Sequence, residues 1–215
     1  MKLINSIKYK KAKIAIIGLG YVGLPLLINF LAKKFLVVGL DSNKLKISNL
    51  RKGKTNILKF SKSFKKIYKS KNLFLTSNYE IIKEVDIIII CLPTPIRSNK
   101  APDLDDIKNC LLNLKKYIKK EQLISLESTT YPGTTRELIC NMVFKKKFQL
   151  GKNFYVVYSP EREDPTMKNF SVGNIPKLVS GSTRNCQKLG NYLYQQITKT
   201  VSVSSLVTAE FTKIL

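Results

Sequence analysis

The stretch Lys13–Asp41 constrains the fold of this chain more than any other part of it. An apolar run, Ile14–Ile17, ends at a turn with glycines at G-x-G-x-x-G spacing, and an apolar helix-like segment follows. A second apolar run, Leu36–Leu40, then ends on Asp41. A strand, a glycine turn, a helix and a second strand that ends in an acid form the βαβ pattern of dinucleotide-binding domains, so we expect such a site here.

Each residue of the turn has an expected task. Gly18 permits the tight turn, Gly20 lets the backbone approach a pyrophosphate, and Gly23 lets the helix pack closely on the strand. Tyr21 lies in the same turn, beside the free N–H groups at a helix N-terminus, which bind phosphate. Asp41 lies 21 residues after Gly20, where a carboxylate accepts the ribose hydroxyls and disfavours a 2′-phosphate. The sequence therefore predicts NAD as the cofactor, in preference to NADP.

The same stretch has an alternative interpretation as a membrane anchor. Ile14–Ala32 is free of charge for nineteen residues, which is long enough to span a bilayer, and it has basic flanks. Against this, the glycines fall at the fingerprint spacing, Pro25 and Asn29 interrupt the run, and a strand pattern follows at once. No membrane association is expected.

The net charge of +24 raises the question of a nucleic-acid partner. Of the 38 basic residues, 33 are lysines and five are arginines, whereas proteins that read bases favour arginine forks. The densest basic region, Lys44–Lys71, contains no recognisable nucleic-acid motif. We expect a solvated basic surface and no specific nucleic-acid partner.

Histidine is absent, which excludes a histidine general base and a histidine-ligated metal site, and no metal is expected. The four cysteines are dispersed and form no C-x-x-C pair, and no secretory cleavage pattern is present. They are expected to be reduced thiols of a cytoplasmic protein.

Apolar runs and helix-like segments alternate along the chain, and this rhythm predicts an α/β fold with a doubly wound parallel sheet. Further strands are expected at Leu73–Thr76, Ile87–Leu92, Leu123–Leu126, Phe154–Tyr158, Lys177–Val179 and Thr200–Val203. Further helices are expected at about 43–51, 61–71, 79–85, 103–118, 135–144 and 185–196, and a last one begins at Ser204 or Ser205.

Polar and turn-forming residues collect where three of these strands end: at 93–95, 128–130 and 159–161. The ends of parallel strands share one edge of a sheet, the edge that carries the glycine turn. We therefore expect hydroxyls and a carboxylate to face the cofactor there.

A Y-x-x-x-K pair at Tyr79 and Lys83 falls too early in the chain for a short-chain dehydrogenase and is interpreted as an ordinary helix face.

Five motifs follow one another in the order GLGYVGLP, CLPTP, ESTTYPGTT, YSPERED and IPKLVSG. From Lys13 to Leu215 the chain resembles the UDP-glucose/GDP-mannose dehydrogenase family, and most closely its UDP-N-acetylglucosamine and UDP-N-acetylmannosamine 6-dehydrogenase branch. The resemblance implies an NAD-dependent, metal-free, two-step oxidation of a sugar C6 alcohol to a carboxylate. A cysteine thiolate holds the aldehyde between the two steps. A UDP-sugar substrate and a homo-oligomeric full-length protein are also implied.

The resemblance assigns roles by position. Thr129 matches the family's water-positioning threonine, Glu161 its acid/base, and Lys213 the lysine whose ammonium stabilises the developing oxyanion. Beyond the glycine turn, the implied cofactor contacts are Val22, Asp41, Lys46, Pro93, Thr94 and again Thr129.

The chain also departs from the family pattern. The family's asparagine after Lys213, its nucleophilic cysteine and its sugar-binding domain are expected past Leu215, and none of the four cysteines present has the nucleophile's context. Other branches carry a cofactor-contacting glutamate at the place of Pro165, for which Glu163 or Asp164 would have to substitute.

The expected organisation is a polar lead-in at 1–12, a Rossmann-type NAD-binding domain at 13–203, and the start of a connecting helix at 204–215. As the NAD-binding portion, the chain is expected to be inactive alone. The alternative function is a catalytically silent NAD-binding or partner-binding domain.

Overall fold

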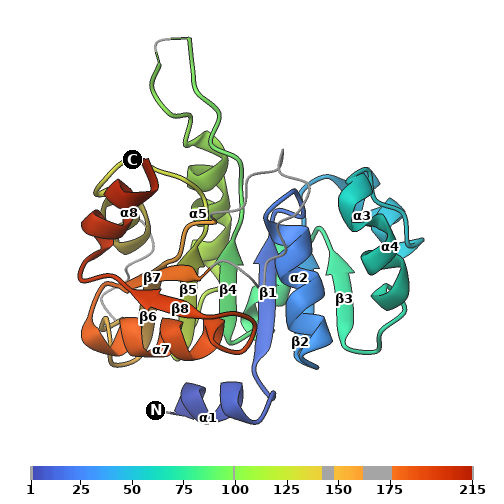
Figure 1. The fold of residues 1–215 in the computed structure, drawn as a ribbon, viewed down its shortest axis with the longest axis horizontal. Coiled ribbons are helices and arrows are strands. Elements are labelled where there is room, and N and C mark those ends of the chain that lie inside the picture. Colours follow the sequence, from blue (N-terminus) through green and yellow to red (C-terminus); the bar gives the residue numbers. More distant parts are fainter. Residues whose placement is uncertain (1, 99, 142–147, 162–175, 215) are drawn as a thin grey trace.

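Eight strands form one sheet in the computed structural model, which describes residues 2–98, 100–141, 148–161 and 176–214 (Figure 1). The strands are β1 (Lys13–Ile17), β2 (Leu36–Leu40), β3 (Leu73–Thr76), β4 (Ile87–Ile90), β5 (Gln122–Leu126), β6 (Phe154–Tyr158), β7 (Lys177–Gly181) and β8 (Thr200–Ser202). The helices are α1 (Lys2–Lys8), α2 (Gly23–Ala32), α3 (Lys44–Arg51), α4 (Leu58–Ile67), the 3₁₀-helix η1 (Tyr79–Glu84), α5 (Asp105–Tyr117), the π-helical segment η2 (Thr135–Cys140), α7 (Arg184–Tyr194) and α8 (Leu206–Ile214).

The strand order is β3-β2-β1-β4-β5-β6-β7-β8, and β1 to β6 run parallel. This order confirms the doubly wound sheet that the alternating pattern predicts. One strand departs from the predicted parallel sheet: β7 runs antiparallel to β6, with Tyr158 opposite Ser180. The first residue of β7, Lys177, therefore lies at the edge where the parallel strands end.

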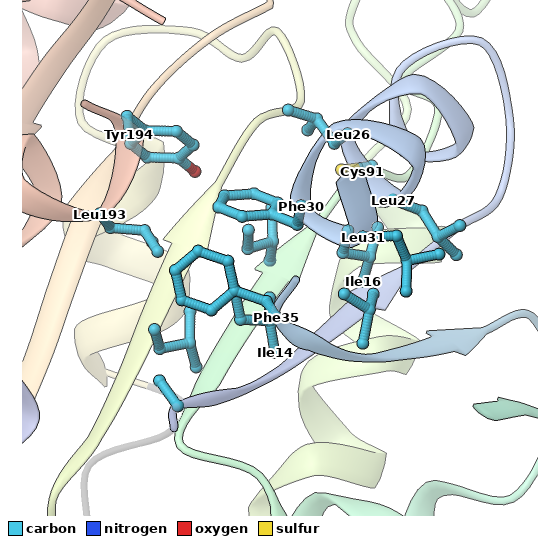
Figure 2. Packing of buried hydrophobic residues seen from close by; sticks show 14 of the residues in the cluster. Ile14, Ile16, Leu26, Leu27, Phe30, Leu31, Phe35, Cys91, Leu193 and Tyr194 are labelled. Atoms are coloured by element: carbon cyan, nitrogen blue, oxygen red, sulfur yellow. The ribbon is translucent and has the colours of Figure 1, made fainter. Parts of the chain in front are cut away.

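Two hydrophobic clusters cover the two faces of the sheet. Alternate residues of β1 divide between them, because successive side chains of a strand point to opposite faces. Ile14 and Ile16 pack with α1, α2, α3, α4 and α7, whereas Ala15 and Ile17 pack with η1, α5, η2 and α8. Figure 2 shows part of the first cluster, in which Phe30 of α2 lies beside Phe35 and Tyr194. The four isoleucines of β4 are fully buried, as expected for a central strand covered on both faces.

The N-terminal segment differs from the expected polar lead-in. Residues 2–8 form α1, and its Leu3 and Ile7 are buried in the same cluster as α7. These two side chains are four residues apart and therefore share one helix face.

No helix in the described ranges is long and apolar enough to cross a membrane.

Candidate functional site

A cavity of about 700 Å³ opens at the carboxyl ends of β1 and β4. These neighbouring strands are followed by helices on opposite faces of the sheet, and open α/β sheets bind ligands at such a switch point. Seven of the expected cofactor residues line the cavity: Gly18, Gly20, Tyr21, Val22, Asp41, Lys46 and Pro93.

The three glycines of the turn have different surroundings and different roles. Gly18 has a φ of +88°, and a Cβ there would lie 2.6 Å from the carbonyl oxygen of Cys91. A Cβ at Gly23 would lie 1.9 Å from the carbonyl oxygen of Gly18, so only glycine allows this approach of helix to strand. A Cβ at Gly20 would meet nothing within 4 Å.

The N-terminus of α2 is prepared for an anion. The N-cap residue, Val22, makes no side-chain capping hydrogen bond, and no acidic residue occupies the first turn. The positive end of a helix dipole favours a phosphate at such a position. Together with the open space at Gly20, this arrangement fits the pyrophosphate of a dinucleotide.

Asp41 is fixed at the end of β2 by three contacts. Its Oδ2 accepts a hydrogen bond from the backbone N–H of Leu19 at 2.9 Å and lies 2.6 Å from the ammonium nitrogen of Lys46. Its Oδ1 accepts from the N–H of Asn43 at 3.0 Å. The carboxylate is therefore held by the glycine turn and by α3 before any ligand binds, and it has a cation beside it.

The opposite wall of the cavity comes from η1 and α5, and the sequence did not predict it. Tyr79 lies there, and Asp106, Asn109, Cys110 and Asn113 project from α5 at the spacing of one helix face. That spacing of polar residues was the available signal. Burial and the neighbouring Cys110 raise the pKa of Tyr79 well above its usual range, and burial raises the pKa of Cys110 to about 12. Lys83 of the Y-x-x-x-K pair is exposed and pairs with Glu80 at 2.8 Å.

Hydrogen bonds join the ends of β4 and β5. The hydroxyl of Thr94 donates to the carbonyl of Thr129 at 2.7 Å, and the hydroxyl of Ser128 donates to the carbonyl of Leu92 at 2.6 Å. These bonds bring the predicted residues Thr94 and Thr129 together beside Pro93, which lines the cavity.

A buried charged cluster lies where β5, β6 and β7 meet. The ammonium nitrogen of Lys177 is 2.6 Å from Oε2 of Glu127 and 3.1 Å from Oε2 of Glu161. The hydroxyl of Tyr194 donates to the other oxygen of Glu127 and lies 2.8 Å from Oγ of Ser125. Of this cluster, the sequence predicts a role for Glu161 alone. Glu127 and Lys177 occur in the quoted motifs ESTTYPGTT and IPKLVSG, but nothing in a linear pattern pairs them.

Helix α8 is attached to the loop after β5 by a buried carboxylate. Glu210 accepts from the N–H of Gly133 at 2.6 Å and from the N–H and hydroxyl of Thr135 at 2.8 and 2.6 Å. Lys213 lies three residues further along α8 and is partly buried. The carboxylate therefore fixes the register of the helix that carries Lys213. Glu163, Asp164 and Pro165 lie outside the described residues.

A parallel sheet whose switch point holds a glycine turn, with an acid at the end of the neighbouring strand, defines a dinucleotide-binding Rossmann-type domain. The sequence comparison places this one more closely. The chain belongs to the UDP-glucose/GDP-mannose dehydrogenase family, and residues 12–198 match its NAD binding domain. The cofactor of this domain is therefore NAD, as the sequence predicts.

Two sequence relatives and one solved structure show what this chain is similar to. The chain is 36% identical over 210 residues to UDP-N-acetyl-D-glucosamine 6-dehydrogenase of Pseudomonas aeruginosa, covering 96% of this chain and 49% of the relative. It is 38% identical over 208 residues to the Salmonella typhi protein of the same name, covering 95% and 48%. The structure of the UDP-N-acetyl-mannosamine dehydrogenase Cap5O of Staphylococcus aureus superposes with a TM-score of 0.84 at 27% identity, covering 94% of this chain and 50% of that one. The chain thus spans about half the length of the relatives it matches.

Proposed function

We propose that this chain is the NAD-binding part of a nucleotide-sugar 6-dehydrogenase that oxidises a UDP-N-acetylhexosamine to its uronic acid in two steps. The observation that carries the proposal is the cavity at the glycine turn, in a chain whose family binds NAD with this domain. The names of the relatives support the substrate class. We also propose a cytoplasmic location, a homo-oligomeric full-length form and no specific nucleic-acid partner.

The residues present supply the contacts that NAD requires. Gly20 and the N–H groups at the start of α2 would hold the pyrophosphate, and Asp41 and Lys46 the adenosine ribose. Pro93 and the linked pair Thr94 and Thr129 would face the nicotinamide half. When bound, NAD accepts the hydride from the sugar.

Three residues are proposed to act on the substrate. Thr129 would position a water molecule, and Glu161 would hold or release a proton from its place beside Lys177. Lys213 would stabilise an oxyanion, in a register fixed by Glu210. The limits of the NAD-binding domain at 13–203 and of the connecting helix at 204–215 stay predictions.

The covalent step is proposed to use none of the four cysteines of this chain. The thiolate is the nucleophilic form of cysteine, and burial opposes it. All four cysteines are buried. Burial raises the pKa of Cys91 well above its usual value, that of Cys110 to about 12 and that of Cys140 to about 11. We expect the 215-residue chain to bind NAD without oxidising a UDP sugar.

Calorimetric titration of the chain with NAD tests the proposal, with Gly20→Leu and Gly20→Ala as graded variants. A Cβ at Gly20 meets open space, so the unliganded variants should melt like the wild type. The leucine would occupy the expected pyrophosphate position and should weaken NAD binding at least tenfold, with alanine in between. Wild-type affinity in Gly20→Leu would contradict the site.

An activity assay separates the two candidate functions. The chain should form no NADH from UDP-N-acetylglucosamine, UDP-N-acetylmannosamine or UDP-glucose. Adding a homologous sugar-binding domain should restore turnover if the chain belongs to a dehydrogenase, and should not if it is a silent NAD-binding domain. Two NADH per sugar from the chain alone would show that the assigned roles are wrong.

A further inference from the structure

Lys177 has an unusual position for a lysine. Its side chain is 5% exposed, and β7 brings it to the carboxyl edge of the sheet because this strand runs opposite to β6. Continuing the β6–β7 register places Lys177 level with Glu161, just beyond the last paired residues. Its N–H donates to the carbonyl of Lys199 at 2.8 Å, so its backbone is fixed as well.

The side chain of Lys177 bridges two carboxylates of different exposure. Glu127 on one side has 0% of its side chain exposed, and Glu161 on the other has 17%. The ammonium nitrogen lies 2.6 Å from Glu127 and 3.1 Å from Glu161. It also lies 5.4 Å from the centre of the Tyr194 ring. The hydroxyl of this tyrosine donates a hydrogen bond to Oε1 of Glu127. Figure 2 shows this tyrosine packed on the apolar cluster, which fixes it in turn.

We propose that Lys177 is the positioning residue for Glu161: anchored by Glu127 and Tyr194, its ammonium holds the Glu161 carboxylate in place at the carboxyl edge of the sheet. The backbone supports the same arrangement, because the N–H of Glu161 donates to the carbonyl of Glu127 at 3.3 Å. The functional meaning of this role rests on the proposed acid/base function of Glu161.

The charges of the cluster explain why two carboxylates are needed. A lone ammonium buried this deeply would lose its proton or destabilise the fold. Burial lowers the pKa of Lys177, but Glu127 and Glu161 more than offset this and raise it above its usual range. Cys91 faces the same cluster and stays a thiol, because burial raises its pKa. Lys177 therefore stays charged. Glu127 fixes the position of its ammonium group, which also attracts the carboxylate of Glu161.

Carbon-13 NMR of glutamate-labelled chain tests the inference, because the sequence has only eight glutamates whose carboxyl signals need assignment. The decisive pair is Glu127→Gln and the double variant Glu127→Gln with Lys177→Met. Both avoid a stranded buried carboxylate at Glu127. Loss of a cation at 3.1 Å should raise the pKa of Glu161 by about one to three units in the double variant relative to Glu127→Gln.

The single variant Lys177→Met, if folded, should raise the pKa of Glu161 by at least as much relative to wild type, because Glu127 remains beside it. Lys199→Met is the matched control, since it removes an equal charge from an exposed neighbour and should leave Glu161 unchanged. Titration of Glu161 at the same pH with and without Lys177 would overturn the inference. NAD titration of the same samples distinguishes the proposed function from the positioning role of Lys177. Failure to bind NAD would contradict the proposed function but would not affect the measured pKa change of Glu161.

Discussion

Two carboxylate–lysine pairs lie at the carboxyl edge of this sheet, and they have the same separation in different surroundings. Asp41 and Lys46 are 2.6 Å apart beside the open cavity, and Glu127 and Lys177 are 2.6 Å apart inside the protein. Both carboxylates are buried, with 6% of Asp41 and 0% of Glu127 exposed, so the pairs differ in their lysines: Lys46 is 32% exposed and Lys177 5%. Distance alone therefore says little about what either pair contributes.

The difference lies in the water that each pair has lost. In the first pair Lys46 keeps part of its hydration, so its attraction to Asp41 is partly screened and breaking the pair changes stability less. A pair inside gives up hydration on both partners, and each then depends on the other. The first pair is suited to exchange contacts with a ligand, whereas the second is suited to hold a geometry.

Lys177→Met tests the buried pair most severely. The substitution leaves Glu127 inside the protein without its cation, and we expect a loss of about 3–5 kcal/mol in the free energy of unfolding. Adding Glu127→Gln should recover much of this loss, because the stranded charge is then gone. Urea unfolding of the wild type, the single and the double variant above about pH 7, where Glu127 of the wild type is ionised, measures it. A single variant as stable as the double would contradict the dependence of each partner on the other.

Glu127 should also make stability depend on pH. Burial raises the pKa of this carboxyl to about 7, against about 4.5 in the unfolded chain. Between these values the folded state holds a proton that the unfolded state has lost, so stability is greatest below about pH 4.5, falls as the pH rises, and levels off above pH 7. Considered alone, the group contributes about 3 kcal/mol over this window.

The sequence has no histidine, so no imidazole titrates between pH 4.5 and pH 7, and the pH dependence of stability in this range can be assigned to carboxyl groups. Glu127→Gln should flatten the decline in urea-unfolding free energy between pH 5 and pH 7. An equal slope in wild type and variant would show that another group carries the dependence.

Local sequence was enough to predict the elements that surround the cofactor cavity. β2 and β3 lie where their apolar runs predict, and Asp41 ends β2. Each of these features depends on neighbours in the chain, namely an apolar run between polar turns. α4 begins at Leu58, three residues before the predicted start, and this residue is 86% exposed. A boundary on an exposed face has no apolar signal to fix it.

The buried cluster could not be predicted in this way. Glu127 and Lys177 are 50 residues apart, and they meet because β7 runs antiparallel to β6. The strand pattern of β7 has the same period in either direction, so it carries no information on orientation. The same holds for Glu210, whose partners Gly133 and Thr135 are more than 70 residues away. Such contacts follow from the fold, and only the fold could show them.

Asp41→Asn tests the pair beside the cavity through its ligand. The asparagine oxygen retains an acceptor for a backbone N–H, but the charge is gone, and NAD binding should weaken by about 1–3 kcal/mol. Wild type should prefer NAD to NADP. The variant should narrow that preference, because Lys46 is released from Asp41 and the repulsion of a 2′-phosphate is removed. Calorimetry with both cofactors measures the change, and an equal loss for NADP would contradict it.

Lys46→Met should have the smallest effect on stability and completes the comparison. Asp41 keeps its hydrogen bonds from the N–H groups of Leu19 and Asn43, and water replaces the lost ammonium. The expected change in unfolding free energy is about 0.2–1 kcal/mol, and it should shrink further in high salt because exposed charges are screened. Lys44→Met, at an exposed position of the same helix, is the control for loss of charge alone. Since the two pairs have equal separations, a loss of 3 kcal/mol or more in Lys46→Met would show that burial is not what distinguishes them.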